Sequence, residues 1–255
     1  MSQPWPILVI NLDRSIDRLA SISAALNRRG LHFDRVRATE AEDRSAKLPR
    51  RSYLGGEFYA DLTPTEQACR ESHLRALQAV AISPARAVLV LEDDADFSDD
   101  AFKVLHELAN LPGPLPDCIS LFGMRARGAT LERLRSGHAL ISSVSPPIGA
   151  VAILWTPAGA RKFLAAADRR KHRPIDVQRK HWWEGDLNAT WISPAPIREH
   201  AQLGAQSTIG SRNKSGPRNA LAKWSYRVRF MASSHWRFLC RRGAVRWWKA
   251  QERVG

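Results

Sequence analysis

A short apolar run that ends in a cluster of acids most constrains the fold of this chain. Residues 87–91 read Ala-Val-Leu-Val-Leu, and Glu92, Asp93, Asp94 and Asp96 follow at once. A strand buried on both faces of a sheet has this continuous apolar pattern, and in open α/β sheets ligands bind beyond the carboxyl ends of such strands. The pattern therefore predicts a buried strand that presents carboxylates at the ligand-binding edge of an α/β sheet.

Clustered carboxylates repel one another unless a cation neutralises them. Mg²⁺ and Mn²⁺ prefer oxygen ligands, and they are often held by one or two carboxylates together with substrate phosphates. A divalent metal site is therefore the favoured interpretation of this strand end. The alternative is a solvent-exposed acidic turn, although such a turn does not usually follow so apolar a strand.

Strand-like and helical segments alternate along the first 160 residues. The clearest helix start is Thr63-Pro64-Thr65-Glu66, which has the pattern of a capping box with proline in the first turn. Alternation of this kind predicts a mostly parallel sheet with helices on both faces. The expected strands are 7–12, 33–38, 86–91, 118–122, 139–144 and 148–154, and the expected helices are 15–29, 63–81, 99–111 and one that begins at 156–159.

The basic charge is concentrated at the C-terminal end. Residues 212–255 carry twelve Lys or Arg and one acid, whereas residues 1–211 carry 27 basic and 24 acidic residues. Residues 213–217 have the composition of a linker. We therefore predict two parts, an α/β domain over residues 1–211 and a basic helical tail over residues 212–255.

Apolar residues of the tail recur mostly at three- and four-residue steps, which is typical of an amphipathic helix. A basic helix with tryptophan rings is typical of proteins that bind anionic membrane surfaces. Two alternatives are a helix that packs on the domain and a nucleic-acid-binding segment, of which the second is less favoured. The recurring residues are Leu221, Trp224, Val228, Met231, His235, Phe238, Val245 and Trp248.

Two further features bear on location. No window approaches the ~18 to 20 apolar residues that a membrane-spanning helix needs. Cys69, Cys118 and Cys240 form no CxxC pair, so neither a zinc site nor a disulfide framework is indicated. We expect reduced thiols in a cytoplasmic protein that binds peripherally at the inner face of the membrane.

Seven blocks of the sequence carry a resemblance, in order: 9–18, 33–38, 62–73, 89–94, 149–154, 174–176 and 206–209. Together they resemble the bacterial lipooligosaccharide glycosyltransferases of family 25, which are related to the collagen galactosyltransferases. The resemblance implies a GT-A-like (Rossmann-like) fold. It also implies metal-dependent, inverting transfer of a hexose, galactose from UDP-galactose, to a lipooligosaccharide or other saccharide acceptor. The implied cofactor is Mn²⁺ or Mg²⁺.

The resemblance puts Glu92-Asp93-Asp94 in the place of the family's metal-binding Asp-x-Asp element. We expect Asp94 to be the direct ligand and Glu92 a second ligand or a ribose contact, with Asp93 pointing away because side chains alternate along a strand. His200 is a further candidate ligand, since imidazole suits Mn²⁺. The alternative for His200 is a core or surface histidine.

Donor contacts are expected at the ends of the first two strands, with His73 on the helix of the 62–73 block as a further candidate. An arginine there would pair with phosphate oxygens through its planar fork. His73 has the alternative role of a structural histidine on the face that packs on the sheet. The expected donor-binding residues are Asn11, Asp13, Arg14, Arg18, His73, Glu92 and Asp93.

Inversion by a single displacement needs a general base that takes the proton of the acceptor hydroxyl. Asp176 is the first candidate because it matches the Pro-x-Asp block, and Asp186 and Glu184 follow; Asp176 could instead cap a helix. Trp182 and Trp183 could offer aromatic faces to a sugar ring.

Two other functions stay open. A nucleotidyltransferase or phosphohydrolase would use the same carboxylates, although the sequence has neither a P-loop nor a second dense acidic cluster. A non-catalytic adaptor would act through the basic tail on a membrane or a nucleic acid.

Overall fold

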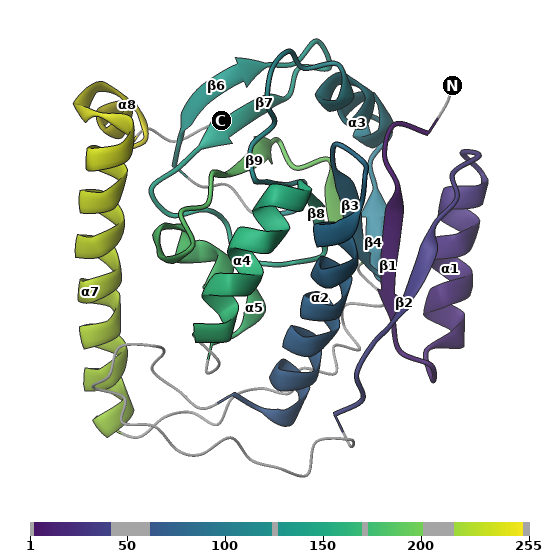
Figure 1. Ribbon diagram of the computed structural model, residues 1–255, viewed down its shortest axis with the longest axis horizontal. Helices are drawn as coiled ribbons and strands as arrows, with labels where there is room; N and C mark the ends of the chain where they lie inside the picture. The colour runs from purple at the N-terminus through teal and green to yellow at the C-terminus, as the bar shows by residue number, and fades with distance from the viewer. Residues whose placement is uncertain (1–2, 42–61, 124–126, 170–172, 201–216, 252–255) are drawn as a thin grey trace.

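A mixed eight-stranded sheet forms the centre of the computed structural model, which describes residues 3–41, 62–123, 127–169, 173–200 and 217–251 (Figure 1). Its strands, in spatial order, are β2 (Asp34–Arg37), β1 (Ile7–Asn11), β3 (Val88–Glu92), β8 (Ala152–Trp155), β5 (Cys118–Ser120), β9 (Ala189–Ser193), β7 (Ala139–Ser142) and β6 (Ala129–Arg133). A second sheet pairs β4 (Ala95–Phe97) with β10 (Ile197–Glu199) in antiparallel fashion.

Six of the eight strands point in the same direction. β1 pairs in parallel with both β2 and β3, and β5 pairs in parallel with β9. β8 runs opposite to its neighbours β3 and β5, and β7 runs opposite to β9 and β6. The prediction of an α/β fold with a mostly parallel sheet flanked by helices is therefore confirmed.

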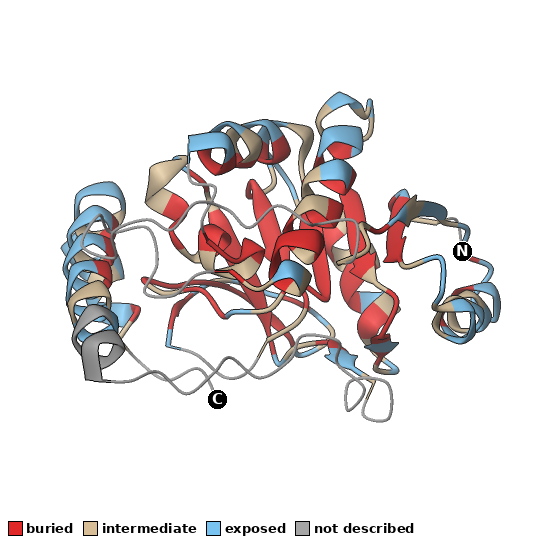
Figure 2. Ribbon diagram, turned by 90° about the horizontal axis from the view of Figure 1, so that it is seen from below, coloured by how far each residue is buried: buried red, intermediate tan, exposed pale blue. Residues whose placement is uncertain are grey.

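Helices cover both faces of the sheet because side chains alternate along each strand. One face packs against α1 (Ile16–Asn27) and α3 (Ala101–Ala109), and the other packs against α2 (Pro64–Ile82), α4 (Pro157–Arg169) and α5 (Ile175–Lys180). Buried residues are concentrated in the strands and in the helix surfaces that face them (Figure 2).

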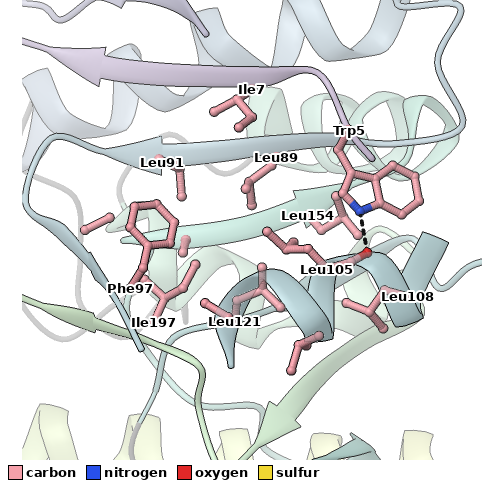
Figure 3. Close-up of a cluster of buried hydrophobic side chains, with 14 of the residues drawn as sticks. Trp5, Ile7, Leu89, Leu91, Phe97, Leu105, Leu108, Leu121, Leu154 and Ile197 are labelled. Atoms are coloured by element: carbon pink, nitrogen blue, oxygen red, sulfur yellow. Dashed lines mark hydrogen bonds between the residues drawn. The ribbon is translucent and has the colours of Figure 1, made fainter. Parts of the chain in front are cut away.

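The cluster under α3 shows how the N-terminal segment is fixed. Leu89 and Leu91 of β3 point into it, and Leu105 and Leu108 of α3 meet them (Figure 3). The indole Nε1 of Trp5 donates a hydrogen bond to the backbone oxygen of Leu105, 3.0 Å away. The start of β1 is thereby tied to the helix layer.

A capping box sets the start of α2, as the sequence predicts. The backbone N–H of Glu66 donates to Thr63 Oγ1 at 3.2 Å, and the backbone N–H of Thr63 donates to Glu66 Oε2 at 2.9 Å. These reciprocal bonds satisfy two N–H groups that have no partner within the helix.

The C-terminal region forms α7 (Pro217–Arg242) and α8 (Ala244–Lys249). α7 contacts the rest of the chain through Phe230, Ser234 and Phe238, which are buried and lie four residues apart. The ring of Phe238 packs edge-on against Trp182 of the 3₁₀ turn η2 (Trp182–Glu184), with centroids 6.2 Å apart. On this face, α7 therefore packs on the domain, which was one of the alternatives predicted for the tail.

Much of the predicted apolar stripe instead faces solvent. Trp224, Val228, Met231, Val245 and Trp248 are exposed, each by 47% or more. No helix within the described ranges is long and apolar enough to cross a membrane. The predicted boundary at 211/212, the 213–216 part of the linker and the side chain of Leu221 lie outside what the structure describes.

Candidate functional site

A cavity of about 150 Å³ lies at the carboxyl ends of β1 and β3. These strands are parallel neighbours, so their ends meet at the same edge of the sheet. The inner face of α2 forms another wall. Predicted site residues that line the cavity are Asn11, Arg14, Arg18, His73, Glu92, Asp93 and Asp94.

Asn11 and Asp93 join the two strand ends. Asn11 Nδ2 donates to Asp93 Oδ2 at 2.7 Å, and Asn11 Oδ1 accepts from Arg35 Nε at 3.0 Å. Burial raises the pKa of Asp93, while the hydrogen bond from Asn11 and the charge of Arg18 act in the opposite direction. Both residues line the cavity, so their hydrogen bond holds the two strand ends together at the site.

Arg18 connects both aspartates. Its Nη1 lies 3.2 Å from Asp93 Oδ1, and its Nη2 pairs closely with Asp94 Oδ2. The prediction that Asp93 points away is wrong, because β3 ends at Glu92 and the two aspartates form a turn in which strand alternation no longer applies. Arg18 is thus a cation inside the acidic cluster.

Asp94 is the most perturbed carboxyl of the site. Burial raises its pKa to about 7, the charge of Glu92 adds to the rise, and Arg18 opposes it. Within the part of the chain that the structure describes, its Oδ1 is buried without a hydrogen-bond partner, and so is Nδ1 of His200. The backbone N–H of His200 donates to the backbone oxygen of Asp94 at 2.8 Å. Each residue thus has one buried atom that could bind a metal, and the two residues lie on adjacent segments. This arrangement fits the prediction that Asp94 and His200 are metal ligands.

Glu92 has a different neighbour. Its Oε1 lies 2.9 Å from His73 Nε2, and Cys69 completes a trio whose ligand atoms all lie within 4.8 Å of one another. Burial, and then the charge of Glu92, raise the pKa of the Cys69 thiol well above its usual value. Sequence reasoning did not assign Cys69 a role. The four-residue spacing of Cys69 and His73 on one helix was the available signal.

Two of the predicted donor contacts, Asp13 and Arg14, pair with charged residues outside the acidic cluster. Asp13 does not line it; its carboxylate accepts from Arg35 Nη2 at 2.5 Å and pairs with Arg37 Nε at 2.6 Å. Arg14 lines the cavity, is half exposed and pairs with Glu40 at 2.7 Å.

The three candidate bases occupy different environments. Asp176, in the first turn of α5, accepts from the backbone N–H of Val177 at 2.7 Å and of Gly149 at 3.3 Å. It does not line the cavity, but its charge raises the pKa of Cys69, which does. Asp186 and Glu184 both form ion pairs with arginines away from the cavity.

The side chain of Asp186 is 79% exposed and pairs with Arg241 of α7 at 2.9 Å. Glu184 pairs with the buried Arg173 at 2.7 Å. Neither residue lines the cavity. Asp176 is therefore the one candidate base of the three whose charge acts on the cavity residue Cys69.

The expectation that Trp182 offers a face to a sugar ring is wrong. The residue is 5% exposed, and its Nε1 donates to the backbone oxygen of Val144 at 3.1 Å. Phe238 of α7 covers it. Trp183 is half-buried and packs against Phe230 of the same helix.

Comparisons with known proteins give one family match. The family model described as "Glycosyltransferase family 25 (LPS biosynthesis protein)" matches residues 5–177. No curated protein matches the chain significantly. Among solved structures, the glycosyltransferase GlyE of Streptococcus pneumoniae TIGR4 aligns with 93% of this chain at 8% identity and a TM-score of 0.43. This chain spans 64% of the length of that protein.

Proposed function

Because the chain belongs to glycosyltransferase family 25, we propose that it transfers galactose from UDP-galactose to a saccharide acceptor of a lipooligosaccharide, with inversion. Membership of the family makes it a glycosyltransferase. The donor, the acceptor, the stereochemistry, the metal and a GT-A-like fold are our proposals. The observation that carries them is the cavity at the ends of β1 and β3, where cationic and acidic side chains meet.

The donor's diphosphate requires positive charge. Arg14 and Arg18 line the cavity, and a guanidinium can pair with two phosphate oxygens at once. A divalent ion such as Mn²⁺, held by Asp94 and His200, would stabilise the negative charge that develops on the leaving diphosphate. In this proposal Arg18, which lies on α1, pairs with the carboxylates of Asp93 and Asp94 and also with the donor's phosphates. It thereby orients the donor in the cavity.

Asp176 is the proposed general base. Two backbone N–H groups hold its carboxylate in one orientation. The carboxylate is half-buried, so its remaining lone pairs can accept a proton from an acceptor hydroxyl. In this proposal Asp176 removes the hydroxyl proton as the acceptor oxygen attacks the sugar.

The tail brings the enzyme to its acceptor in our proposal. Trp224, Met231 and Trp248 are exposed on a segment in which residues 223–251 carry eight Lys or Arg and no Asp or Glu. Exposed apolar rings among basic side chains favour the surface of an anionic membrane. The enzyme would then act at the cytoplasmic membrane face as a peripheral protein.

The decisive assay measures UDP release from a panel of UDP-sugars with Mn²⁺ or with a chelator. Asp94→Asn removes the charge at the proposed ligand while it keeps the side-chain shape. Asp96→Asn is the matched control, because Asp96 is exposed and does not line the cavity. We expect metal-dependent release from UDP-galactose that Asp94→Asn reduces by about 100-fold or more and that Asp96→Asn leaves unchanged.

Other outcomes would point to the other functions. A phosphohydrolase would release UMP and a sugar phosphate from the same donors. An adaptor would turn over none of them, even with lipooligosaccharide extract present. Equal activity in Asp94→Asn and Asp96→Asn would remove the acidic strand end from the mechanism.

A further inference from the structure

We infer that Cys69, His73 and Glu92 form a binding site for a thiophilic divalent cation of the Zn²⁺ class. The ligand atoms of the three side chains lie within 4.8 Å of one another, on the wall of the cavity. His73 Nε2 and Glu92 Oε1 are already 2.9 Å apart. The site is separate from Asp94 and His200, and the inference concerns binding alone, so it does not rest on glycosyl transfer.

Regular elements hold all three ligands. Cys69 and His73 lie one turn apart on α2, so their side chains share the helix face that is turned toward the sheet. Glu92 is the last residue of β3, at the carboxyl end of the strand. Two ligands at this spacing on one helix, with a third from another element, are a recurrent way to hold zinc.

The separations suit a small adjustment to tetrahedral geometry. With Zn–S near 2.3 Å and Zn–N or Zn–O near 2.0–2.2 Å, ligand atoms of a tetrahedral site lie about 3.3–3.6 Å apart. The widest separation in the trio must therefore contract by at most about 1.2–1.5 Å, and the His73–Glu92 separation of 2.9 Å must widen by roughly 0.5 Å, which side-chain rotation can provide. The open side of the cavity leaves room for a fourth ligand, as in zinc sites that bind water or substrate.

The surroundings attract a cation. The charges of Glu66, Asp94 and Asp176 act on the Cys69 thiol along with that of Glu92. Among the described ion pairs Arg18 neutralises Asp93 and Asp94, while Glu92 has only the imidazole of His73. Binding of the cation forms a sulfur–metal bond and breaks the S–H bond, and the proton is released to solvent.

Ligand chemistry separates this site from the one proposed for Mn²⁺. A thiolate with an imidazole selects Zn²⁺, Co²⁺ or Cd²⁺, whereas Mg²⁺ and Mn²⁺ prefer carboxylates and water. We therefore expect Zn²⁺ to bind here when Mn²⁺ is present in excess. Because Cys69, His73 and Glu92 line the same cavity as Asp94 and Arg18, Zn²⁺ should also obstruct the nucleotide-sugar donor, and this consequence alone depends on the proposed function.

Co²⁺ is the probe for the test, since a thiolate bound to Co²⁺ gives a charge-transfer absorption band in the near ultraviolet. Metal-free, full-length protein without a histidine tag is titrated with Co²⁺. Wild type should bind one Co²⁺ with this band, and Zn²⁺ should displace it. Cys69→Ser should lose the band, and its affinity should fall by more than the roughly 10–100-fold typical of an altered outer-shell partner.

Cys240→Ser is the matched control because Cys240 is exposed on α7 and far from the trio in sequence. It should keep both the band and the affinity. Glu92→Gln is a second probe that keeps the thiol, and it should weaken Co²⁺ binding without removing the band at saturation. Circular dichroism checks the fold of each variant.

Two results would overturn the inference. One is wild-type protein that shows no thiolate band at saturating Co²⁺, and the other is an unchanged band in folded Cys69→Ser. Absent glycosyl transfer would refute the proposed function but would leave these spectra unaffected, so the two failures are distinguishable.

Discussion

Replacing Phe238 with alanine should release α7 from the domain. The side chain is 2% exposed and packs edge-on against Trp182. Full burial of a Phe side chain contributes about 1.5–3 kcal/mol, and an aromatic pair of this geometry adds about 0.5–1.5 kcal/mol. The substitution should therefore cost about 2–4.5 kcal/mol, which overlaps the range for buried Phe→Ala changes, and shift the docking equilibrium by roughly 30- to 2,000-fold.

Trp236→Ala is the control, because Trp236 lies on the same helix and is 64% exposed. Urea unfolding measures the free energy of unfolding, and amide hydrogen exchange of the native protein measures the protection of α7. Phe238→Ala should lower the first and speed exchange throughout the helix, while Trp236→Ala changes either by less than about 0.5 kcal/mol. Equal effects of the two substitutions would refute the docked arrangement.

Three further predictions concern pH, packing and membranes. Burial lowers the pKa of His181 from 6.5 to about 4, so the unfolded state binds the proton more tightly. The free energy of unfolding should therefore fall by about 3 kcal/mol as pH drops through that interval, and by clearly less in His181→Gln; equal slopes would contradict this. Gly159→Ala would place a Cβ 2.1 Å from the backbone oxygen of Asp117, and thermal unfolding should show a loss of about 1–3 kcal/mol; an unchanged midpoint would mean that the backbone yields. Trp248→Ala should weaken sedimentation with phosphatidylglycerol vesicles several-fold at unchanged stability, and undiminished binding would exclude this face.

The docking of α7 also changes how the tail should be tested. Deletion of residues 212–255 would remove Phe230 and Phe238 and uncover the apolar surface around Trp182. A truncated protein could then bind vesicles or aggregate through a surface that is normally covered. Point substitutions on the exposed side of α7 and α8 avoid this problem.

The main layers of the fold were predictable because local signals agree with tertiary structure. The apolar run of β3 and the capping box of α2 each specify their element without help from distant residues. β10 was not predictable, since it is three residues long, has two exposed positions and is defined by pairing with β4, about 100 residues earlier. The helix at α7 was predictable from its period, but its buried side depends on Trp182.

The sequence predicts that the candidate site lies at the ends of particular strands, but it does not predict which side chains of the site contact one another. Parallel pairing of β1 and β3 brings Asn11 to Asp93, and the alternating pattern of strands anticipates that edge. The turn at Asp93 and Asp94 was not anticipated, and it is what lets Arg18 reach both carboxylates. The approach of Cys69 to Glu92 depends on how α2 packs on the sheet, which no spacing reports.

The most direct measurement of the central claim is the mass of the acceptor after reaction. Purified protein, UDP-galactose and Mn²⁺ are incubated with deacylated lipooligosaccharide, and the products are analysed by mass spectrometry. The account predicts a gain of one hexose with wild type and with Asp96→Asn, and a yield lower by about 100-fold or more with Asp94→Asn. No gain with any UDP-sugar, or the same gain with Asp94→Asn, would contradict transfer at this cavity.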